Sequence, residues 1–505
     1  MQDNILVGGG GDGYGQAQNL LLALTNRHGL IAGATGTGKT VTLQILAEGL
    51  SAAGVPVFLS DVKGDLSGLA AAGSPTHKLH QMFTDRAATI GFALTYAAFP
   101  VTFWDLFGKQ GHPVRATVAE MGPLLLSRLM ELTDVQEGVL NVAFRVADED
   151  GLPLLDLEDL QALLVWVGQN ATDLSLRYGN VATASVGAIQ RQLLVLENQG
   201  GAELFGEPAL DLADLMVVDA DGRGRINVLA ADTLMNSPRL YATFLLWLLS
   251  ELFEVLPEVG NPDKPKLVFF FDEAHLLFKD APRALVDKVE QVARLIRSKG
   301  VGVFFITQNP ADVPDSVLSQ LGNRVQHALR AFTGKDRKDL EKAAQTYRDN
   351  PRFSTVDAIR DVGTGEAVTS LLDAKGVPMI VERTLIRPPS SQLGPIEPGL
   401  RAALMAASPM GLKYKTRLNR DSAAEMLGRK ADAAAREADA AKADDDGLKN
   451  ARRYDGDRTD RPGGRSTRSE GGFGGAFANV VVKELTGTTG RRIVRGILGG
   501  LFRGR

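Results

Sequence analysis

The sequence predicts an α/β fold with a parallel sheet, a helical insertion and a partly helical, partly disordered C-terminal extension. Short apolar runs that end in glycine or polar residues recur between helical patterns, which is typical of parallel strands joined by crossover helices. Between about residues 113 and 215, apolar residues recur at the spacing of long amphipathic helices. Beyond about residue 388 the pattern typical of a globular core fades. With 505 residues and 44% hydrophobic content, the chain can bury a large core.

The first part of the predicted core covers residues 1–108. An apolar run at 28–32 predicts a strand, and a glycine-rich loop then leads into a helical pattern at 41–50. Residues 55–60 predict the next strand, which ends at Asp61. The order is therefore strand, loop, helix and strand.

The helical insertion is predicted at 109–225, and the second part of the core at 226–390. Strand patterns return at 226–229, 267–271 and 301–306. The last two of these runs are apolar throughout, so we expect central strands that are buried on both faces.

The C-terminal region is predicted to divide into a helical extension, 391–446, and a basic, partly disordered tail, 447–505. The tail holds 13 Lys and Arg against 5 Asp and Glu, while the whole chain has a net charge of −4. Arginines mixed with apolar residues could bind nucleic-acid phosphates or an anionic membrane. A solvated tail, or one that packs on the body, explains the pattern equally well.

Several classes of protein are excluded by composition. The chain has no cysteine, so disulfides, thiolate metal sites and cysteine nucleophiles are absent. No secretory signal is recognised, and the most apolar stretch, 240–256, is interrupted by Ser250, Glu251 and Glu254. We therefore expect a soluble, cytoplasmic protein.

A phosphate-binding loop is the clearest motif in the chain. Gly33–Thr40 reads GATGTGKT, which matches the pattern GxxxxGK[ST] between a predicted strand and a predicted helix. Backbone N–H groups can surround the phosphates of ATP, Lys39 can reach the β- and γ-oxygens, and Thr40 can bind Mg²⁺. The expected nucleotide-binding residues are Gly33, Ala34, Thr35, Gly36, Thr37, Gly38, Lys39, Thr40 and Val41.

Two acids follow the apolar run 267–271. Asp272 lies where a second magnesium ligand is expected, and Glu273 can activate the attacking water as a general base. Acids that cap the next helix are the structural alternative. Gln308 ends the following strand and could orient water or sense the γ-phosphate, although a turn glutamine that satisfies backbone groups is equally consistent with the pattern.

Five motifs together resemble the HerA-like family of ATPases, which is related to FtsK, and most closely its short bacterial YjgR-type branch. They span roughly 26–387, about three quarters of the chain. The motifs are NRHGLIAGATGTGKT at Asn26–Thr40, DVKGDLSG at Asp61–Gly68, FDEAH at Phe271–His275, TQNPADVP at Thr307–Pro314 and LGNRVQHALRAFT at Leu321–Thr333.

The resemblance implies a RecA-like core and a hexameric ring in which an arginine of one subunit completes the ATP site of its neighbour. Arg324, Arg330 and Arg297 are the candidates, and for each an ordinary salt bridge is the alternative. The Asp61–Asp65 cluster is expected near the metal or a subunit boundary, or else as a turn that caps a helix. Members of the family carry an N-terminal β-barrel, but only 32 residues precede Gly33, so no dedicated nuclease partner is expected.

The sequence therefore favours a magnesium-dependent ATPase that acts on DNA as a ring helicase or translocase. One alternative is an ATP-driven machine that acts on protein or membrane-associated complexes, which the mildly acidic body favours. The other is a nucleotide-gated scaffold without catalysis. The presence of Lys39, Asp272 and Glu273 argues against the scaffold, because a scaffold needs no acid to activate water.

Overall fold

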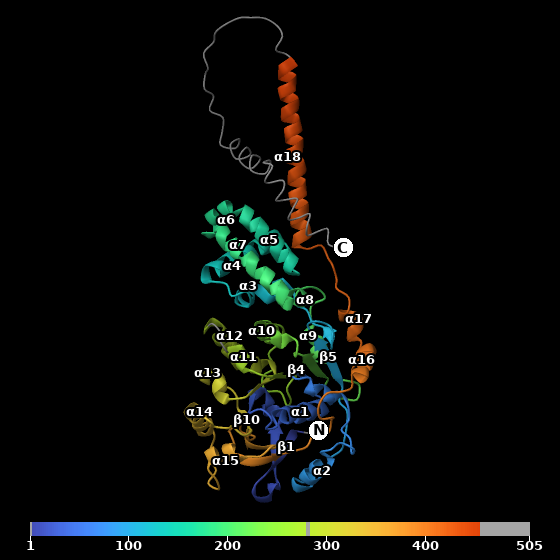
Figure 1. The fold of residues 1–505 in the computed structure, drawn as a ribbon, viewed down its shortest axis with the longest axis vertical. Helices are drawn as coiled ribbons and strands as arrows, with labels where there is room; N and C mark the ends of the chain where they lie inside the picture. Colours follow the sequence, from blue (N-terminus) through green and yellow to red (C-terminus); the bar gives the residue numbers. More distant parts are fainter. Residues whose placement is uncertain (1–2, 279–282, 455–505) are drawn as a thin grey trace.

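A 12-stranded mixed sheet forms the centre of the computed structural model, which describes residues 3–278 and 283–454 (Figure 1). Across the sheet the strands follow in the order β2 (Gln16–Leu21), β1 (Asn4–Gly10), β12 (Glu382–Ile386), β11 (Glu366–Ser370), β10 (Asn323–Gln326), β3 (Gly29–Ala32), β9 (Val301–Thr307), β8 (Leu267–Phe271), β4 (Val57–Asp61), β7 (Ile226–Ala230), β5 (Val101–Asp105) and β6 (His112–Pro113).

The sheet has a parallel part and an antiparallel margin. Strands from β10 to β6 run parallel, which confirms the predicted fold class. Strands β2, β1, β12 and β11 form an antiparallel margin beside β10. Their sequences, such as QAQNLL in β2 and ERTLI in β12, are short and mixed in polarity, so they gave no strand signal.

Helices cover both faces of the sheet, which explains why its central strands are apolar. Side chains alternate between the faces, so Phe269 and Phe271 of β8 belong to one core cluster and Phe270 to the other. Outside the insertion and the C-terminal region, the helices are α1 (Lys39–Ala52), α2 (His80–Thr89), α10 (Pro238–Val255), α11 (His275–Phe278), α12 (Arg283–Leu295), α13 (Asp315–Leu318), α14 (Gly334–Gln345) and α15 (Thr355–Asp361).

The predicted insertion is helical from Val118 onwards, whereas its first residues add β6 to the sheet. Its first helices begin with capping boxes, as in Thr117 with Glu120 and Thr133 with Gln136. They pack on the α10 side of the sheet, above it in Figure 1. The helices are α3 (Val118–Leu129), α4 (Asp134–Asp150), α5 (Leu157–Gln169), α6 (Ala171–Tyr178), α7 (Thr183–Leu196), α8 (Ala202–Leu204) and α9 (Leu212–Leu215).

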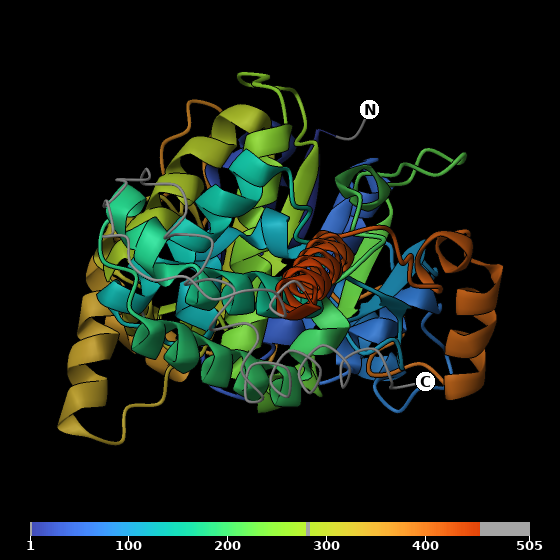
Figure 2. The ribbon, with the colours of Figure 1, turned by 90° about the horizontal axis from the view of Figure 1, so that it is seen from above.

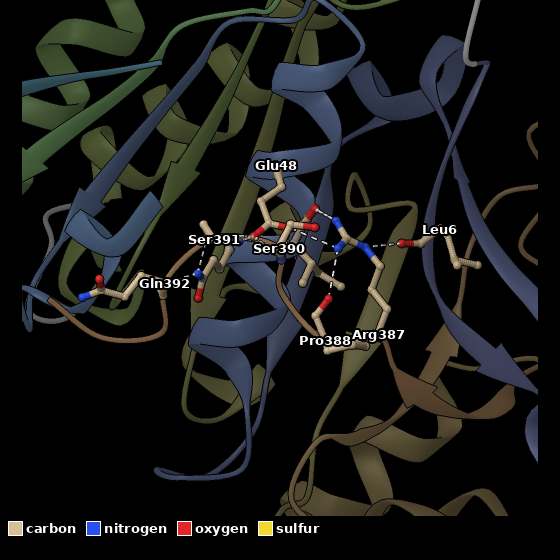
Figure 3. A network of polar contacts seen from close by, with 9 residues as sticks. Leu6, Glu48, Arg387, Pro388, Ser390, Ser391 and Gln392 are labelled. Atoms are coloured by element: carbon tan, nitrogen blue, oxygen red, sulfur yellow. Dashed lines mark hydrogen bonds and ion pairs between the residues drawn. The ribbon is translucent and has the colours of Figure 1, made fainter. Parts of the chain in front are cut away.

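The chain beyond β12 is tied to α1 by a buried ion pair. Nη1 of Arg387 lies 3.0 Å from Oε2 of Glu48, and the other Glu48 oxygen accepts hydrogen bonds from the backbone N–H groups of Ser390 and Ser391 (Figure 3). Helices α16 (Pro398–Ala407) and α17 (Met410–Tyr414) then follow the flank of the molecule.

The last described element is the long helix α18 (Ala423–Tyr454), which projects beyond the insertion in Figure 1 and is seen nearly end-on in Figure 2. Its first turn is fixed to α5, because Oδ1 of Asp159 accepts a 2.8 Å hydrogen bond from N of Ala424. The helix continues into the predicted tail, and residues 455–505 lie outside the described part of the chain. In the described residues no helix, α10 included, is both long and apolar enough to cross a bilayer. The predicted boundaries at 108, 225, 390 and 446 stay predictions.

Candidate functional site

The candidate site lies where β3, β9 and β8 end at the same edge of the sheet. Ala32 is in register with Thr307, and Phe271 with Phe305. The loops that follow these strands therefore start side by side, as the carboxyl ends of neighbouring parallel strands do. The edge brings together the phosphate loop, the Asp272–Glu273 pair and Gln308.

The backbone of the phosphate loop is fixed at its start by the neighbouring strands. N of Gly33 donates to O of Thr307 at 3.2 Å, and N of Ala34 donates to O of Ala328 at 2.8 Å. A side chain at Gly33 would place its Cβ 2.5 Å from Cβ of His327, so only glycine fits there. Gly36 and Gly38 have positive φ angles of 79° and 116°, and α1 begins directly afterwards at Lys39. The residues predicted to bind nucleotide thus form one continuous loop and helix start.

Lys39 folds back over this loop. Its Nζ donates to O of Gly33 at 2.5 Å and to O of Ala34 at 3.1 Å. Burial lowers the pKa of the Lys39 ammonium, whereas the negative charges of Glu273 and Asp272 raise it. The lysine therefore lies between the loop and the two acids, where an anionic ligand of the loop would meet it.

The peptide before Glu273 is held by two residues that sequence reasoning missed, Ser60 of β4 and Tyr241 of α10. Oγ of Ser60 accepts from N of Asp272 at 3.2 Å and donates to the hydroxyl of Tyr241, and this hydroxyl donates to O of Asp272 at 2.7 Å. Ser60 precedes the predicted strand end at Asp61, so register could have suggested it. Tyr241 gave no signal, because it lies within an apolar helix.

Glu273 has a strained backbone and a poorly satisfied carboxylate. Its φ is 49°, which is uncommon for a residue with a side chain and typical of functional positions. Its Oε2 is buried and accepts no hydrogen bond from any described residue, although Nδ1 of His275 lies 3.3 Å away. Oε1 lies 3.5 Å from Nε2 of Gln308. The structure thus brings Glu273 and Gln308 together, and the predicted place of Gln308 beside the γ-phosphate stays a prediction.

The surroundings of Asp272 raise the pKa of its carboxyl. Burial raises the pKa of its carboxyl to about 7, the charge of Glu273 contributes in the same direction, and Lys63 acts against it. One oxygen, Oδ1, accepts a 2.9 Å hydrogen bond from N of Glu273. A buried carboxylate with a raised pKa gains from a nearby cation.

These groups fit the protein side of a magnesium site of the P-loop type. Such sites use few protein ligands, and phosphate oxygens and water complete the octahedron. The described residues contain no cluster of three or more His, Asp or Glu that could hold a metal alone. Thr40 in the first turn of α1 and Asp272 at the end of β8 are oxygen donors of the required hard type.

The three candidate arginines lie in different surroundings. Arg324 in β10 donates to O of Leu318 at 2.9 Å and O of Leu321 at 3.1 Å, so its guanidinium is occupied by backbone carbonyls. Arg297 precedes the amino end of β9, at the edge opposite the phosphate loop. Arg330 is exposed, and no hydrogen bond or ion pair joins it to another described residue. Their roles stay predictions.

The Asp61 cluster divides into a structural acid and an exposed lysine. Oδ2 of Asp61 accepts a 3.0 Å hydrogen bond from N of Leu66, so this acid caps the turn that follows β4. Burial raises the pKa of Asp61 to about 6. The ammonium of Lys63 is exposed at the same edge, close enough to Lys39 and Asp272 to affect the pKa of each.

Known proteins share the sequence pattern. The chain matches the family model described as "Helicase HerA-like C-terminal" over residues 10–505. It is 26% identical over 172 residues to the DNA double-strand break repair helicase HerA of Sulfolobus acidocaldarius, which covers 33% of this chain and 34% of that protein. It is 22% identical over 356 residues to the protein of the same name from Sulfurisphaera tokodaii, which covers 68% of this chain and 62% of that protein. Both matches thus span less than two thirds of the relatives.

Solved structures share the fold. The bacterial conjugative coupling protein TrwB, in its unbound form, superposes with a TM-score of 0.50 at 15% identity and covers 79% of this chain and 91% of its own. TrwB in complex with a non-hydrolysable GTP analogue gives a TM-score of 0.51 at 14% identity, with 79% and 92% covered. At this identity the likeness shows the fold alone.

Proposed function

We propose that this protein, which belongs to the helicase HerA-like C-terminal family, hydrolyses ATP with the help of Mg²⁺ and uses the energy to move on or unwind DNA. The proposal is carried by one observation. The phosphate loop, the Asp272–Glu273 pair and Gln308 converge at one edge of the sheet, with Gln308 3.5 Å from Glu273.

The chemistry follows from the position of each group. Lys39 and the N–H groups of the loop bind the phosphates, while Thr40 and Asp272 hold the metal. Bound Mg²⁺ supplies charge that stabilises the transferring phosphoryl group. Glu273 accepts a proton from the attacking water through its unsatisfied oxygen, and Gln308 orients that water. The products are ADP and phosphate.

A neighbouring subunit in a ring, expected to be a hexamer, supplies the last positive charge. Arg330 suits this role best among the candidates, because Arg324 is bonded to carbonyls and Arg297 lies at the opposite edge. In the described part of the chain the Arg330 guanidinium makes no hydrogen bond or ion pair, so it is available to a neighbouring subunit. An arginine supplied to an ATP site stabilises the transition-state charge.

DNA is proposed as the substrate because both curated relatives are named DNA double-strand break repair helicases. The basic segment 447–505, largely outside the described residues, offers additional contacts with phosphates.

The test is steady-state ATP hydrolysis by the full chain, with and without Mg²⁺, single-stranded DNA and double-stranded DNA. We expect hydrolysis that needs Mg²⁺, is stimulated by DNA and is lost in Glu273→Gln. Hydrolysis indifferent to DNA contradicts the DNA motor and favours a protein or membrane-associated substrate. If the protein binds nucleotide but shows no hydrolysis that is lost in Glu273→Gln, the result contradicts the ATPase and favours the scaffold.

A further inference from the structure

A buried histidine lies beside the phosphate loop and the first turns of α1. His327 follows β10 and is 0% exposed. Its Nε2 lies 2.8 Å from Oγ1 of Thr42, in the first turn and a half of α1, and its Nδ1 lies 2.9 Å from O of Glu366, at the start of β11. The imidazole therefore bridges the helix that carries Lys39 and the antiparallel margin of the sheet.

The direction of both hydrogen bonds follows from their partners. A carbonyl oxygen only accepts, so Nδ1 of His327 carries the proton and donates to O of Glu366. Burial and the nearby charge of Lys39 lower the pKa of His327 to about 4, so the ring is neutral at physiological pH. Its Nε2 is then an acceptor, and the hydroxyl of Thr42 donates to it.

A second contact joins the turn before β11, which contains Gly365 and Glu366, to the phosphate loop. N of Gly365 donates to O of Thr37 at 3.2 Å. The turn is itself fixed through the Glu366 carboxylate, which accepts from the hydroxyl of Tyr14 at 2.7 Å, Nη2 of Arg383 at 2.9 Å and N of Gly363 at 2.9 Å. The turn to which His327 donates is thus held by several independent hydrogen bonds.

The ring of His327 also fills the space beside the loop glycines. Its Cβ limits the side chain at Gly33, and its Cε1 lies 3.3 Å from the place that a Cβ at Gly38 would take. These glycines border the two ends of the phosphate loop, so a shift of the imidazole changes the space available to both.

We propose that His327 is a positioning residue for the nucleotide: through its bond to Thr42 it holds α1, and with it Lys39 and Thr40, in the geometry that binds phosphates. The inference rests on the proposed nucleotide binding and adds the residue that preorganises it. Phosphate binding gains from donors that are already in place, because less order has to be created on binding.

Two substitutions at His327 separate the two hydrogen bonds. The amide of glutamine takes the place of Nε2, so His327→Gln can accept from Thr42. The amide of asparagine takes the place of Nδ1, so His327→Asn keeps the donor to Glu366 but does not reach Thr42. Thr42→Val removes the hydroxyl from the helix side, and Thr42→Ser keeps it as a matched control.

The experiment measures the dissociation constant of ADP with Mg²⁺ by isothermal titration calorimetry on the full chain, together with Tm. We expect His327→Asn and Thr42→Val each to weaken ADP binding roughly 3- to 10-fold, the scale of one hydrogen bond. His327→Gln and Thr42→Ser should stay within about twofold of the wild type. The double variant His327→Asn/Thr42→Val should be no weaker than either single variant, because both break the same bond.

Equal affinities in all folded variants overturn the positioning role, even if Tm falls, because a merely structural histidine changes stability alone. Additive losses in the double variant also overturn it. A wild type that binds no ADP contradicts the proposed function instead, so the two failures are distinguishable. Thr42→Val keeps the shape of the side chain and provides the test if His327→Asn does not fold.

Discussion

Two buried groups of charges in this protein are built in opposite ways. At the Glu48–Arg387 pair, both Glu48 oxygens are bonded, and Arg387 also donates to the carbonyls of Leu6, Ile45 and Pro388 (Figure 3). At the phosphate-loop edge, by contrast, Glu273 keeps a buried oxygen without a hydrogen bond from the described residues.

The difference teaches how to recognise a functional charge in this fold. A structural ion pair repays its desolvation only when its remaining hydrogen-bonding capacity is satisfied, as it is at Arg387. The site acids are left with unused capacity, a positive φ at Glu273 and a raised pKa at Asp272, which are costs that a ligand can offset. Substitutions should therefore affect stability at the first group and catalysis at the second.

The largest effect is expected for Arg330→Ala. Loss of an arginine that acts on a neighbouring site should lower kcat about 10³-fold or more, since such arginines contribute 10³ to 10⁵. Arg324→Ala is the matched control, and it should lower Tm because its guanidinium donates to three backbone carbonyls. ATP turnover, Tm and assembly state are measured for both. Normal turnover in Arg330→Ala rejects this arginine and returns the role to the other candidates.

The next largest effect is expected for Arg387→Met, which leaves the buried Glu48 carboxylate without its positively charged partner. Breaking a buried ion pair should cost about 3 to 5 kcal/mol in the free energy of unfolding. Chemical denaturation measures this loss, and turnover per folded molecule should stay close to that of the wild type. Adding Glu48→Gln to this variant should cost less than the sum of the single changes, because the two residues interact directly. A selective loss of kcat at full stability would contradict the structural reading.

The raised pKa of Asp272 predicts that its substitution stabilises the protein, whereas Arg387→Met destabilises it. Its pKa moves from an ordinary 3.8 to about 7 on folding, so the folded state binds more protons between these values and stability falls as pH rises through 7. Asp272→Asn cannot ionise and should raise Tm relative to the wild type at pH 8 in nucleotide-free, metal-free buffer. The gain should shrink at pH 5. Glu48→Gln, where the carboxylate is bonded, should lower Tm instead, and a lower Tm for Asp272→Asn at pH 8 would refute this account.

The smallest effect is expected for Tyr241→Phe, which removes the hydroxyl that bonds Ser60 and the Asp272 carbonyl. Two hydrogen bonds are lost, at about 1 kcal/mol each in the free energy of unfolding, and the one to the Asp272 carbonyl lies next to the site. Because this bond fixes the peptide that precedes Glu273, kcat should fall more than the affinity for ATP. Turnover measured against ATP concentration separates the two quantities. Unchanged kcat would mean that the backbone at Glu273 is held without Tyr241.

Much of the site could be predicted because its residues are close together in the sequence. Gly33–Thr40 and Asp272–Glu273 follow apolar runs directly, and the buried strands β3 and β8 place them at one edge. Strand register could have suggested Ser60, but Tyr241 and the Thr42–His327 bond could not be predicted, because each contact joins segments that are distant in the chain. The antiparallel margin was missed as well, since its short strands are defined by pairing rather than by apolar pattern.

By itself, the sequence determined the parallel α/β core, the phosphate loop and the acid pair, because alternation of apolar runs and local turn chemistry depend on neighbouring residues. Only the tertiary structure decided which candidate arginine has no partner among the described residues, which buried acid has all its hydrogen bonds and which residues pack beside the phosphate loop. Those properties depend on the protein groups that surround each charge, and long-range packing brings these groups together from Tyr14 to Arg387.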